Sequence, residues 1–465
     1  MTRSYSHFQL SDFFSKGSIQ KPTSFPGSST PTCLAIVQHR NGSLATKPLV
    51  PNKKRSKHKT HNAFRRIFQK AQQPIQVLKK TQRLCSLPTE ILVSIISFLD
   101  LPALLSLSST CHLWHRLCSP RNHIVWNELV KADYPTSLQL GDPYAVYREN
   151  HALIKRWNAG QAKVSHLTGH QDNVYCMAWV SKSLFVSGSR DCSLKMWDIS
   201  SNSSSSSSVS PGPVKSKTVH QGSILCLGVS EDKSILVTGS SDSTCIVWSL
   251  PDLTPKPLVF RNHQSGILDL CLALQYCVSS SRDNTVRVWN HTTAKECHSL
   301  VGHSGPVNAL DAEGPWVVSA SGDTTLRLWD VRTGECLRTF SGHAMGLTCV
   351  KIQASMIYSG GQDGRVKIWD QNTGMCTMTL VGHTKLIRAV TCQDGKVVSG
   401  SYDRTLRVWD AKTGKCVLRY QSEDFGWIFS VLMNRTQMIS AGQSKQIMAL
   451  DFGLNSLTNH SNIEI

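Results

Sequence analysis

The sequence predicts a mainly β protein in which a closed ring of four-stranded sheets follows a basic tail and a short helical domain. The main observation is an internal repeat. A stretch resembling Ser-Gly-Asp-Thr-Thr-Leu-Arg-Leu-Trp-Asp, which ends at Asp330, occurs in six successive copies. The last four intervals between the tryptophans of these copies are 41, 40, 40 and 40 residues. A period near 40 with Gly-His at the front of each copy is typical of β-propeller blades, so we expect a seven-bladed propeller over residues 162–453.

Each typical copy carries a His, a Ser or Thr, an Asp and a Trp at the same offsets. In the fourth copy these are His303, Ser319, Asp323 and Trp329. The repeats resemble the WD-repeat family, which implies that the four side chains form a hydrogen-bonded chain within the blade. A Ser-His-Asp hydrolase is not expected, because a triad is defined by its geometry and an active site is not needed six times.

The last copy, residues 421–451, departs from the pattern. It has no blade histidine, Ser444 stands at the Asp position, and Leu450 stands at the Trp position. Residues 164–167 read as a strand that precedes the first Gly-His without a blade of its own. We therefore expect this early strand to complete the last blade and close the ring, which removes exposed sheet edges.

Residues 85–135 predict a small helical domain. Pro88 suits the first turn of a helix, and apolar residues then recur at helical spacing. The apolar surface of these short helices exceeds what about fifty residues can bury, so a partner is expected. The segments LPTEIL, FLDLPALLSLS and CHLWHRL resemble the F-box family. That resemblance implies binding to the Skp-type adaptor of a cullin-based (SCF) ubiquitin ligase, with contacts from Leu87, Pro88, Ile91, Leu92, Ile95, Phe98, Leu99, Leu104 and Leu107.

The remaining segments differ in charge. Residues 1–84 are rich in Ser, Thr, Pro and Lys without periodicity, which predicts a disordered basic tail. Residues 1–89 carry 16 of the 50 Lys and Arg and a single acid, so most of the net charge of +19 lies there. The basic run 53–59 is interpreted either as a nuclear import signal or nucleic-acid contact, or as a solvated linker. A third interpretation is a transit peptide, because the first fifty residues are rich in Ser and poor in acids. Residues 136–161 predict a helical linker, and residues 454–465 a C-terminal tail.

Composition excludes several classes of protein. No run of 18 apolar residues occurs, so neither a transmembrane helix nor a membrane partner is expected. The 16 cysteines are spread along the chain, which fits a reducing compartment and a nuclear or cytoplasmic location. No phosphate-binding glycine loop or metal-ligand cluster stands out. We expect no cofactor, no metal and no catalytic activity.

WD-repeat proteins usually bind partners on the face that carries the turns before the blade Asp. Positions that point there in the family predict substrate contacts from Asn173, Tyr175, Arg190, Arg282, Arg388, Tyr402, Trp427 and Phe429. Arginines at such positions in F-box propellers read phosphorylated degrons, and the planar guanidinium suits phosphate. These three arginines are dispersed over blades one, three and six, however, and the aromatic residues favour an apolar or peptide contact. Both alternatives stay open at this point.

The two resemblances together imply a substrate-recognition subunit of an SCF ubiquitin ligase. The F-box would bind the Skp-type adaptor and, through it, a cullin. The propeller would bind the protein to be ubiquitylated. The alternative is a nuclear WD-repeat scaffold whose basic tail contacts RNA or DNA.

Overall fold

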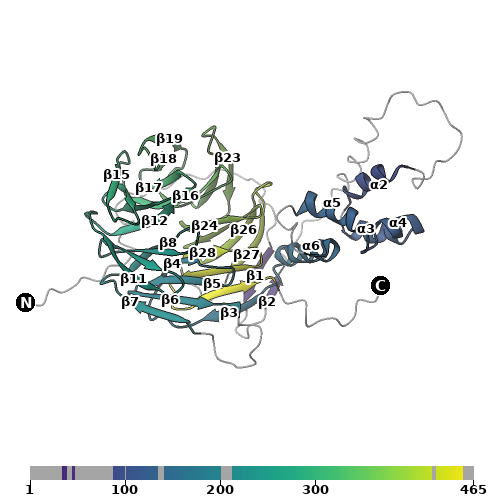
Figure 1. Ribbon diagram of the computed structural model, residues 1–465, viewed down its shortest axis with the longest axis horizontal. Coiled ribbons are helices and arrows are strands. Elements are labelled where there is room, and N and C mark those ends of the chain that lie inside the picture. The colour runs from purple at the N-terminus through teal and green to yellow at the C-terminus, as the bar shows by residue number, and fades with distance from the viewer. Residues whose placement is uncertain are drawn as a thin grey trace, which may run out of the picture. The chain divides into compact units, whose positions relative to one another are not determined.

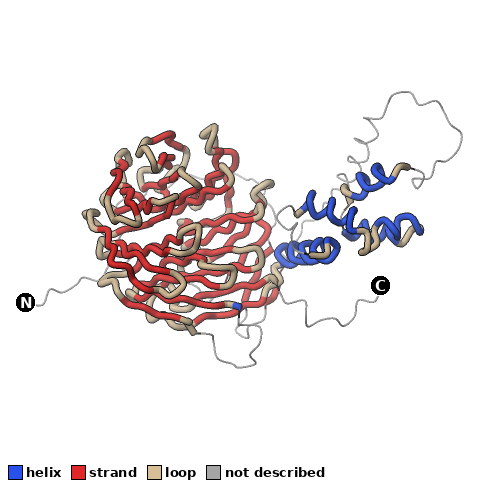
Figure 2. Tube along the Cα trace, in the orientation of Figure 1, coloured by secondary structure: helices blue, strands red, loops and turns tan. Residues whose placement is uncertain are grey.

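The computed structural model describes residues 34–38, 44–47, 87–99, 101–134, 141–200, 212–421 and 426–453. The α-helices of these ranges lie between residues 89 and 159, and the propeller that follows consists of strands joined by turns and loops (Figures 1 and 2). None of the described helices is both long and apolar enough to cross a membrane.

Four short helices form the domain that precedes the propeller. They are α2 (Thr89–Ile96), α3 (Leu101–Ser108), α4 (His112–Leu117) and α5 (His123–Asp133). Helices of this length are marginal alone, and their apolar faces stabilise one another by packing around a shared core. That core includes Leu92, Ile96, Leu104, Trp114, Leu117, Trp126 and Leu129. The indole of Trp126 keeps its hydrogen bond there, because its Nε1 donates to the Ser119 carbonyl at 3.0 Å.

A longer helix, α6 (Pro143–Ala159), leads from this domain to the propeller. It begins where the Asp142 side chain accepts hydrogen bonds from the backbone of Tyr144 and Ala145, and it ends at Gly160 in the left-handed conformation. Tyr147 near its start belongs to the core of the helical domain. Trp157 near its end belongs to a core cluster built from the last two blades. One continuous helix therefore contributes side chains to both cores.

The described part of the propeller contains seven blades of four antiparallel strands each, and in the sixth blade two further strands extend the sheet to six. The strands from the axis outward are β4 (Val174–Trp179), β5 (Leu184–Ser189), β6 (Ser193–Asp198), β7 (Lys215–Thr218); β8 (Ile224–Val229), β9 (Ile235–Ser240), β10 (Cys245–Ser249), β11 (Thr254–Phe260); β12 (Ile267–Ala273), β13 (Tyr276–Ser281), β14 (Val286–Asn290), β15 (Glu296–Leu300); β16 (Val307–Glu313), β17 (Trp316–Ser321), β18 (Thr325–Asp330), β19 (Cys336–Ser341); β20 (Leu347–Gln353), β21 (Met356–Gly361), β22 (Arg365–Asp370), β23 (Cys376–Val381); β24 (Ile387–Gln393), β25 (Lys396–Ser401), β26 (Thr405–Asp410), β27 (Cys416–Gln421); and β28 (Ile428–Met433), β29 (Gln437–Gly442), β30 (Ile447–Asp451), β3 (Lys163–Leu167).

The ring closes as the sequence predicts. Strand β3 pairs antiparallel with β30, with Val164 opposite Leu450, so the first strand of the propeller completes its last blade. The apolar faces of adjacent sheets then cover one another, which is why most inner strands carry buried residues on both faces.

The predicted hydrogen-bonded chain is present in the fourth blade. His303 lies 2.8 Å from both Asp323 and Ser319, and the Trp329 indole donates to Ser319 at 2.8 Å. Asp323 also accepts from the backbone and hydroxyl of Thr325. Partial burial alone raises the pKa of Asp323, but the hydrogen bonds from Thr325 and His303 outweigh it and lower the pKa to about 2. This carboxylate is therefore held ionised within the blade.

The seventh blade lacks this chain. Ser440 occupies the position of Ser319, and its hydroxyl is buried without a hydrogen-bond partner among the described residues. Leu450 is fully buried where the other blades place Trp. This blade instead gains contacts from α6, because Trp157 stacks on Phe452 at 3.7 Å and donates to the Arg435 carbonyl at 3.2 Å.

Two strands differ from the expected disordered tail. β1 (Leu34–Gln38) and β2 (Leu44–Lys47) form a hairpin, and β1 pairs in parallel with β27 at the outer edge of the sixth blade. Pairing supplies partners for the backbone groups of an otherwise open edge, an interaction that side-chain composition does not reveal. The basic run 53–59 and the C-terminal tail from residue 454 lie outside the described residues.

Asp323→Asn is expected to lower the free energy of unfolding by about 1–3 kcal/mol, because it leaves buried donors of the blade without an ionised acceptor. Chemical denaturation followed by tryptophan fluorescence measures the change. Ser444→Ala, at the equivalent turn of the seventh blade, is the matched control and should have little effect. An equal loss in both variants would contradict a role for the chain.

The lowered pKa of Asp323 predicts acid sensitivity of the propeller. Its folded pKa of about 2 lies below the ordinary value of 3.8. The carboxylate therefore stabilises the fold at pH values above the ordinary pKa, and this stabilisation is lost as the pH falls toward 2. Denaturation midpoints should drop as the pH falls from about 4 to about 2, and Asp323→Asn should show a smaller drop. A wild-type midpoint that is constant over this interval would contradict the assignment.

Trp157→Ala is expected to destabilise the propeller by about 3–5 kcal/mol, because it removes a buried ring that packs against the seventh blade. Ile154→Ala on the exposed side of the same helix is the control and should stay within about 1 kcal/mol of wild type. Hydrogen exchange of β28 to β30 localises the effect. Unchanged protection of these strands in Trp157→Ala would show that α6 does not support the blade.

Candidate functional site: the propeller channel and the apolar helical surface

The innermost strands of the seven described blades line a cavity of about 140 Å³ along the propeller axis. A layer of small side chains surrounds it, because six residues after the blade histidine the sequence places Cys or Ala in five typical blades. The exception is Asp269, in the third blade. The cavity-lining members of this layer are Cys176, Cys226, Asp269, Ala309, Cys349, Ala389 and Ser430. The small side chains leave the axis open, and Asp269 makes it polar.

Four of the predicted aromatic residues converge at one end of this channel. Tyr175 lies 5.3 Å from Phe429 between ring centroids, and Phe429 lies 5.8 Å from Tyr402. Tyr402 stacks on Trp427 at 4.7 Å with an angle of 5° between the rings. Tyr175, Tyr402 and Phe429 are buried, whereas Trp427 is half-buried. The first, sixth and seventh blades thus contribute one continuous aromatic cluster.

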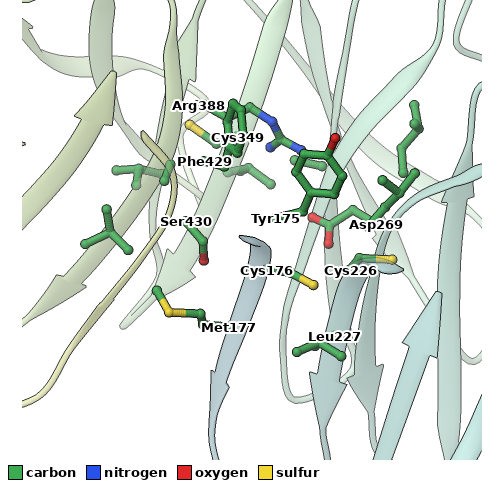
Figure 3. A pocket seen from close by; sticks show the side chains of 17 residues that line it. Tyr175, Cys176, Met177, Cys226, Leu227, Asp269, Cys349, Arg388, Phe429 and Ser430 are labelled. Carbon is green, nitrogen blue, oxygen red and sulfur yellow. The ribbon is translucent and has the colours of Figure 1, made fainter. Parts of the chain in front are cut away.

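Arg388 and Asp269 reach into the same space beside Tyr175 (Figure 3). One guanidinium nitrogen of Arg388 donates to the Thr348 carbonyl at 3.2 Å. The carboxylate of Asp269 accepts from the backbone of Leu270 at 2.9 Å and of Leu310 at 2.8 Å, so it also links the third blade to the fourth. The channel therefore contains one cation and one buried acid on opposite blades.

Burial raises the pKa of Asp269 to about 6, although the two backbone hydrogen bonds and the charge of Arg388 act in the opposite direction. Burial likewise raises the pKa of the Cys349 thiol to about 12 and raises that of Cys176. These channel thiols are thus held in the protonated, weakly nucleophilic form.

The other predicted substrate residues are distributed unequally. Asn173 lies beside the aromatic cluster, since its side chain hydrogen-bonds Tyr175. Arg190 lies near Tyr175 as well, but its Nε is 3.7 Å from Asp172 Oδ2. Arg282 is exposed on the third blade. The structure therefore brings together the aromatic residues, Asn173, Arg190 and Arg388, which belong to the first, sixth and seventh blades, and Arg282 lies on a different blade from all of them.

Asp269 is the channel residue that sequence reasoning missed. A detectable signal exists, because Asp269 is the one ionisable carboxylate at a position where the other typical blades carry Cys or Ala. Comparing the repeats of this chain with one another therefore identifies Asp269 without any related protein.

The helical domain presents an apolar surface of its own. Phe98 is 77% exposed and Ile91 is 47% exposed, both at or beside α2, and Leu105 on α3 and Ile124 on α5 are exposed as well. Leu105 and Ile124 were absent from the predicted contacts. Two predicted contacts need correction, because Leu92 and Leu104 are only 2% and 1% exposed and belong to the core. Leu92 and Leu104 pack beneath the exposed apolar residues. The sequence did not reveal this, because helical spacing alone does not distinguish the inner from the outer apolar side of a helix.

Within the described ranges, no group of three or more His, Cys, Asp or Glu side chains is arranged to hold a metal ion. In the typical blades the Ser or Thr, His and Asp side chains are occupied by internal hydrogen bonds, as in the first, second and sixth blades.

Comparison with known families agrees with both domains. A model described as F-box-like matches residues 84–131. A model described as WD domain, G-beta repeat matches residues 161–198, 212–249, 256–290, 294–330, 334–370 and 374–410. Together these matches cover more than half of the chain. The protein belongs to the F-box proteins with C-terminal WD repeats. Both domain types are typically non-catalytic interaction modules.

Individual relatives match the propeller. Mitochondrial division protein 1 of Schizosaccharomyces pombe is 25% identical over 229 residues, covering 41% of this chain and 35% of that protein. The guanine nucleotide-binding protein subunit beta-1 of Caenorhabditis briggsae is 30% identical over 149 residues, covering 31% and 41%. The present chain thus spans less than half the length of each. The WD40 β-propeller domain of Doa1 is similar in fold, with a TM-score of 0.54 at 22% identity over 62% of this chain and 95% of that one.

Proposed function

We propose that this protein is a substrate receptor of an SCF-type ubiquitin ligase, located in the nucleus, the cytoplasm or both. One combination of features carries the proposal. The F-box-like domain exposes large apolar side chains, and the closed propeller carries an aromatic cluster at the mouth of its channel. One domain offers a site for an adaptor and the other a site for a substrate.

The adaptor side rests on Phe98 and Ile91. Exposed large apolar side chains on so small a domain mark an interaction surface, because water contact with them costs free energy that a partner removes. A Skp-type adaptor is the partner that an F-box implies, and a cullin would follow through that adaptor.

The substrate side rests on the channel mouth and on α6. A receptor accelerates ubiquitin transfer by raising the effective concentration of target lysines near the ubiquitin donor. α6 suits this role, because Tyr147 is buried in the helical domain and Trp157 in the propeller. A helix with buried side chains at both ends links the two binding functions without a flexible spacer between them.

Phe98→Asp combined with Ile91→Asp is expected to reduce co-purification of the Skp-type adaptor and cullin by at least about tenfold, because charged groups would replace the apolar contact. Leu337→Asp on β19 is the matched control, since Leu337 is 46% exposed but lies in the propeller. Circular dichroism checks that both variants fold. Leu92→Asp would not be informative, because it places a charge in the helical core.

Full recovery of adaptor and cullin with the double variant would contradict the proposal. A second candidate, a nuclear scaffold whose basic tail contacts RNA or DNA, is favoured by the charge of residues 1–89, which hold 16 Lys and Arg and one acid. Salt-sensitive nucleic-acid binding that disappears when residues 1–84 are removed, together with absence of adaptor binding, would favour that candidate.

A further inference from the structure

The aromatic cluster at the channel mouth is a supported platform rather than an open cage. Its rings contact one another in sequence from Tyr175 to Phe429, Tyr402 and Trp427. Because Tyr175, Phe429 and Tyr402 are buried, Trp427 offers most of the accessible ring surface. The parallel stack on Tyr402 fixes the orientation of Trp427. A rigid aromatic side chain with one accessible face is a typical anchor for an interface.

The arginines near this mouth are dispersed, and two of them have an acid nearby. Arg190 lies 3.7 Å from Asp172, and Arg388 shares the channel with Asp269. Arg282 is exposed on the third blade, whereas the aromatic cluster belongs to the first, sixth and seventh blades. Strong phosphate recognition needs several arginines whose charge is not offset and whose donors converge. The mouth does not provide that arrangement.

Tyr402 supports the site from beneath. It is 9% exposed, and its hydroxyl is buried without a hydrogen-bond partner in the part of the chain that the structure describes. An incoming peptide does not reach a group with so little accessible surface. Tyr402 therefore contributes to the site through the ring on which Trp427 stacks.

From these contacts we propose that the channel mouth binds an unmodified, extended segment of the substrate, which packs an uncharged apolar side chain on Trp427. This inference rests on the proposed function and specifies its substrate class. It decides between the two alternatives that the sequence left open, in favour of a peptide without phosphate.

Fluorescence anisotropy with synthetic peptide pools tests the proposal. Each pool fixes its central residue as Phe, Leu, Ser, phosphoserine or Lys, and the full-length protein is used in complex with its adaptor. The Phe and Leu pools are expected to bind about tenfold more tightly than the phosphoserine pool, the difference that one well-packed anchor typically supplies. Tightest binding of the phosphoserine pool would overturn the proposal.

Three variants sharpen the test. Trp427→Ala should weaken binding of the Phe pool about tenfold, because it removes the platform. Tyr402→Phe keeps the ring stack and removes only the buried, unpartnered hydroxyl, so it should raise the melting temperature and leave the affinity for the Phe pool within about twofold of wild type. Arg190→Gln should change the affinity less than twofold, since its charge is already offset by Asp172.

The outcomes separate this inference from the proposed function. If no pool binds while the adaptor still co-purifies, or if Arg190→Gln abolishes binding, the peptide site is wrong and the adaptor role stands. If the Phe pool binds as expected but no adaptor co-purifies with the wild type, the ligase role fails. The pools are then repeated with the full chain alone, and Trp427→Ala should still lose affinity.

Discussion

The fold depends on covering both apolar faces of every sheet. A single four-stranded blade cannot hide its two faces from water, so each blade is stable only between two others. Pairing of β3 with β30 satisfies this requirement for the first and last blades at once, because it joins the two ends of the propeller in one sheet. The site at the axis exists because the ring is closed, since its lining comes from the innermost strand of each described blade.

Hydrogen-bonded side chains stabilise the typical blades, and apolar contacts stabilise the seventh. In a typical blade, His303, Ser319, Asp323 and Trp329 satisfy one another within a water-poor interior. The seventh blade has an unpartnered Ser440 hydroxyl instead and receives Trp157 from α6. The blade with the weakest internal hydrogen bonding is therefore the one that the linker helix supports, so ring closure and attachment of the helical domain depend on the same contacts.

Residues that the sequence groups together as partner-facing have different environments in the structure. The family resemblance groups Arg190, Arg282 and Arg388 as partner-facing, but each has a different environment. The first lies 3.7 Å from Asp172, the second is exposed on the third blade, and the third lies in the channel with Asp269. Tyr402 is buried, and its ring stacks on Trp427. The three arginines therefore do not form one group, whereas the aromatic residues do.

The sequence by itself determined the repeat, the number of blades, the closing strand and the helical domain, because these follow from periodicity and from apolar spacing along the chain. It also placed Tyr175, Tyr402, Trp427 and Phe429 at partner-facing positions. Only the tertiary structure showed that Leu92 and Leu104 face inward, that Asp269 lies in the channel, and that β1 adds to β27. The physical reason is that burial, charge pairing and edge pairing arise between residues far apart in the chain, whereas periodicity reports only local spacing.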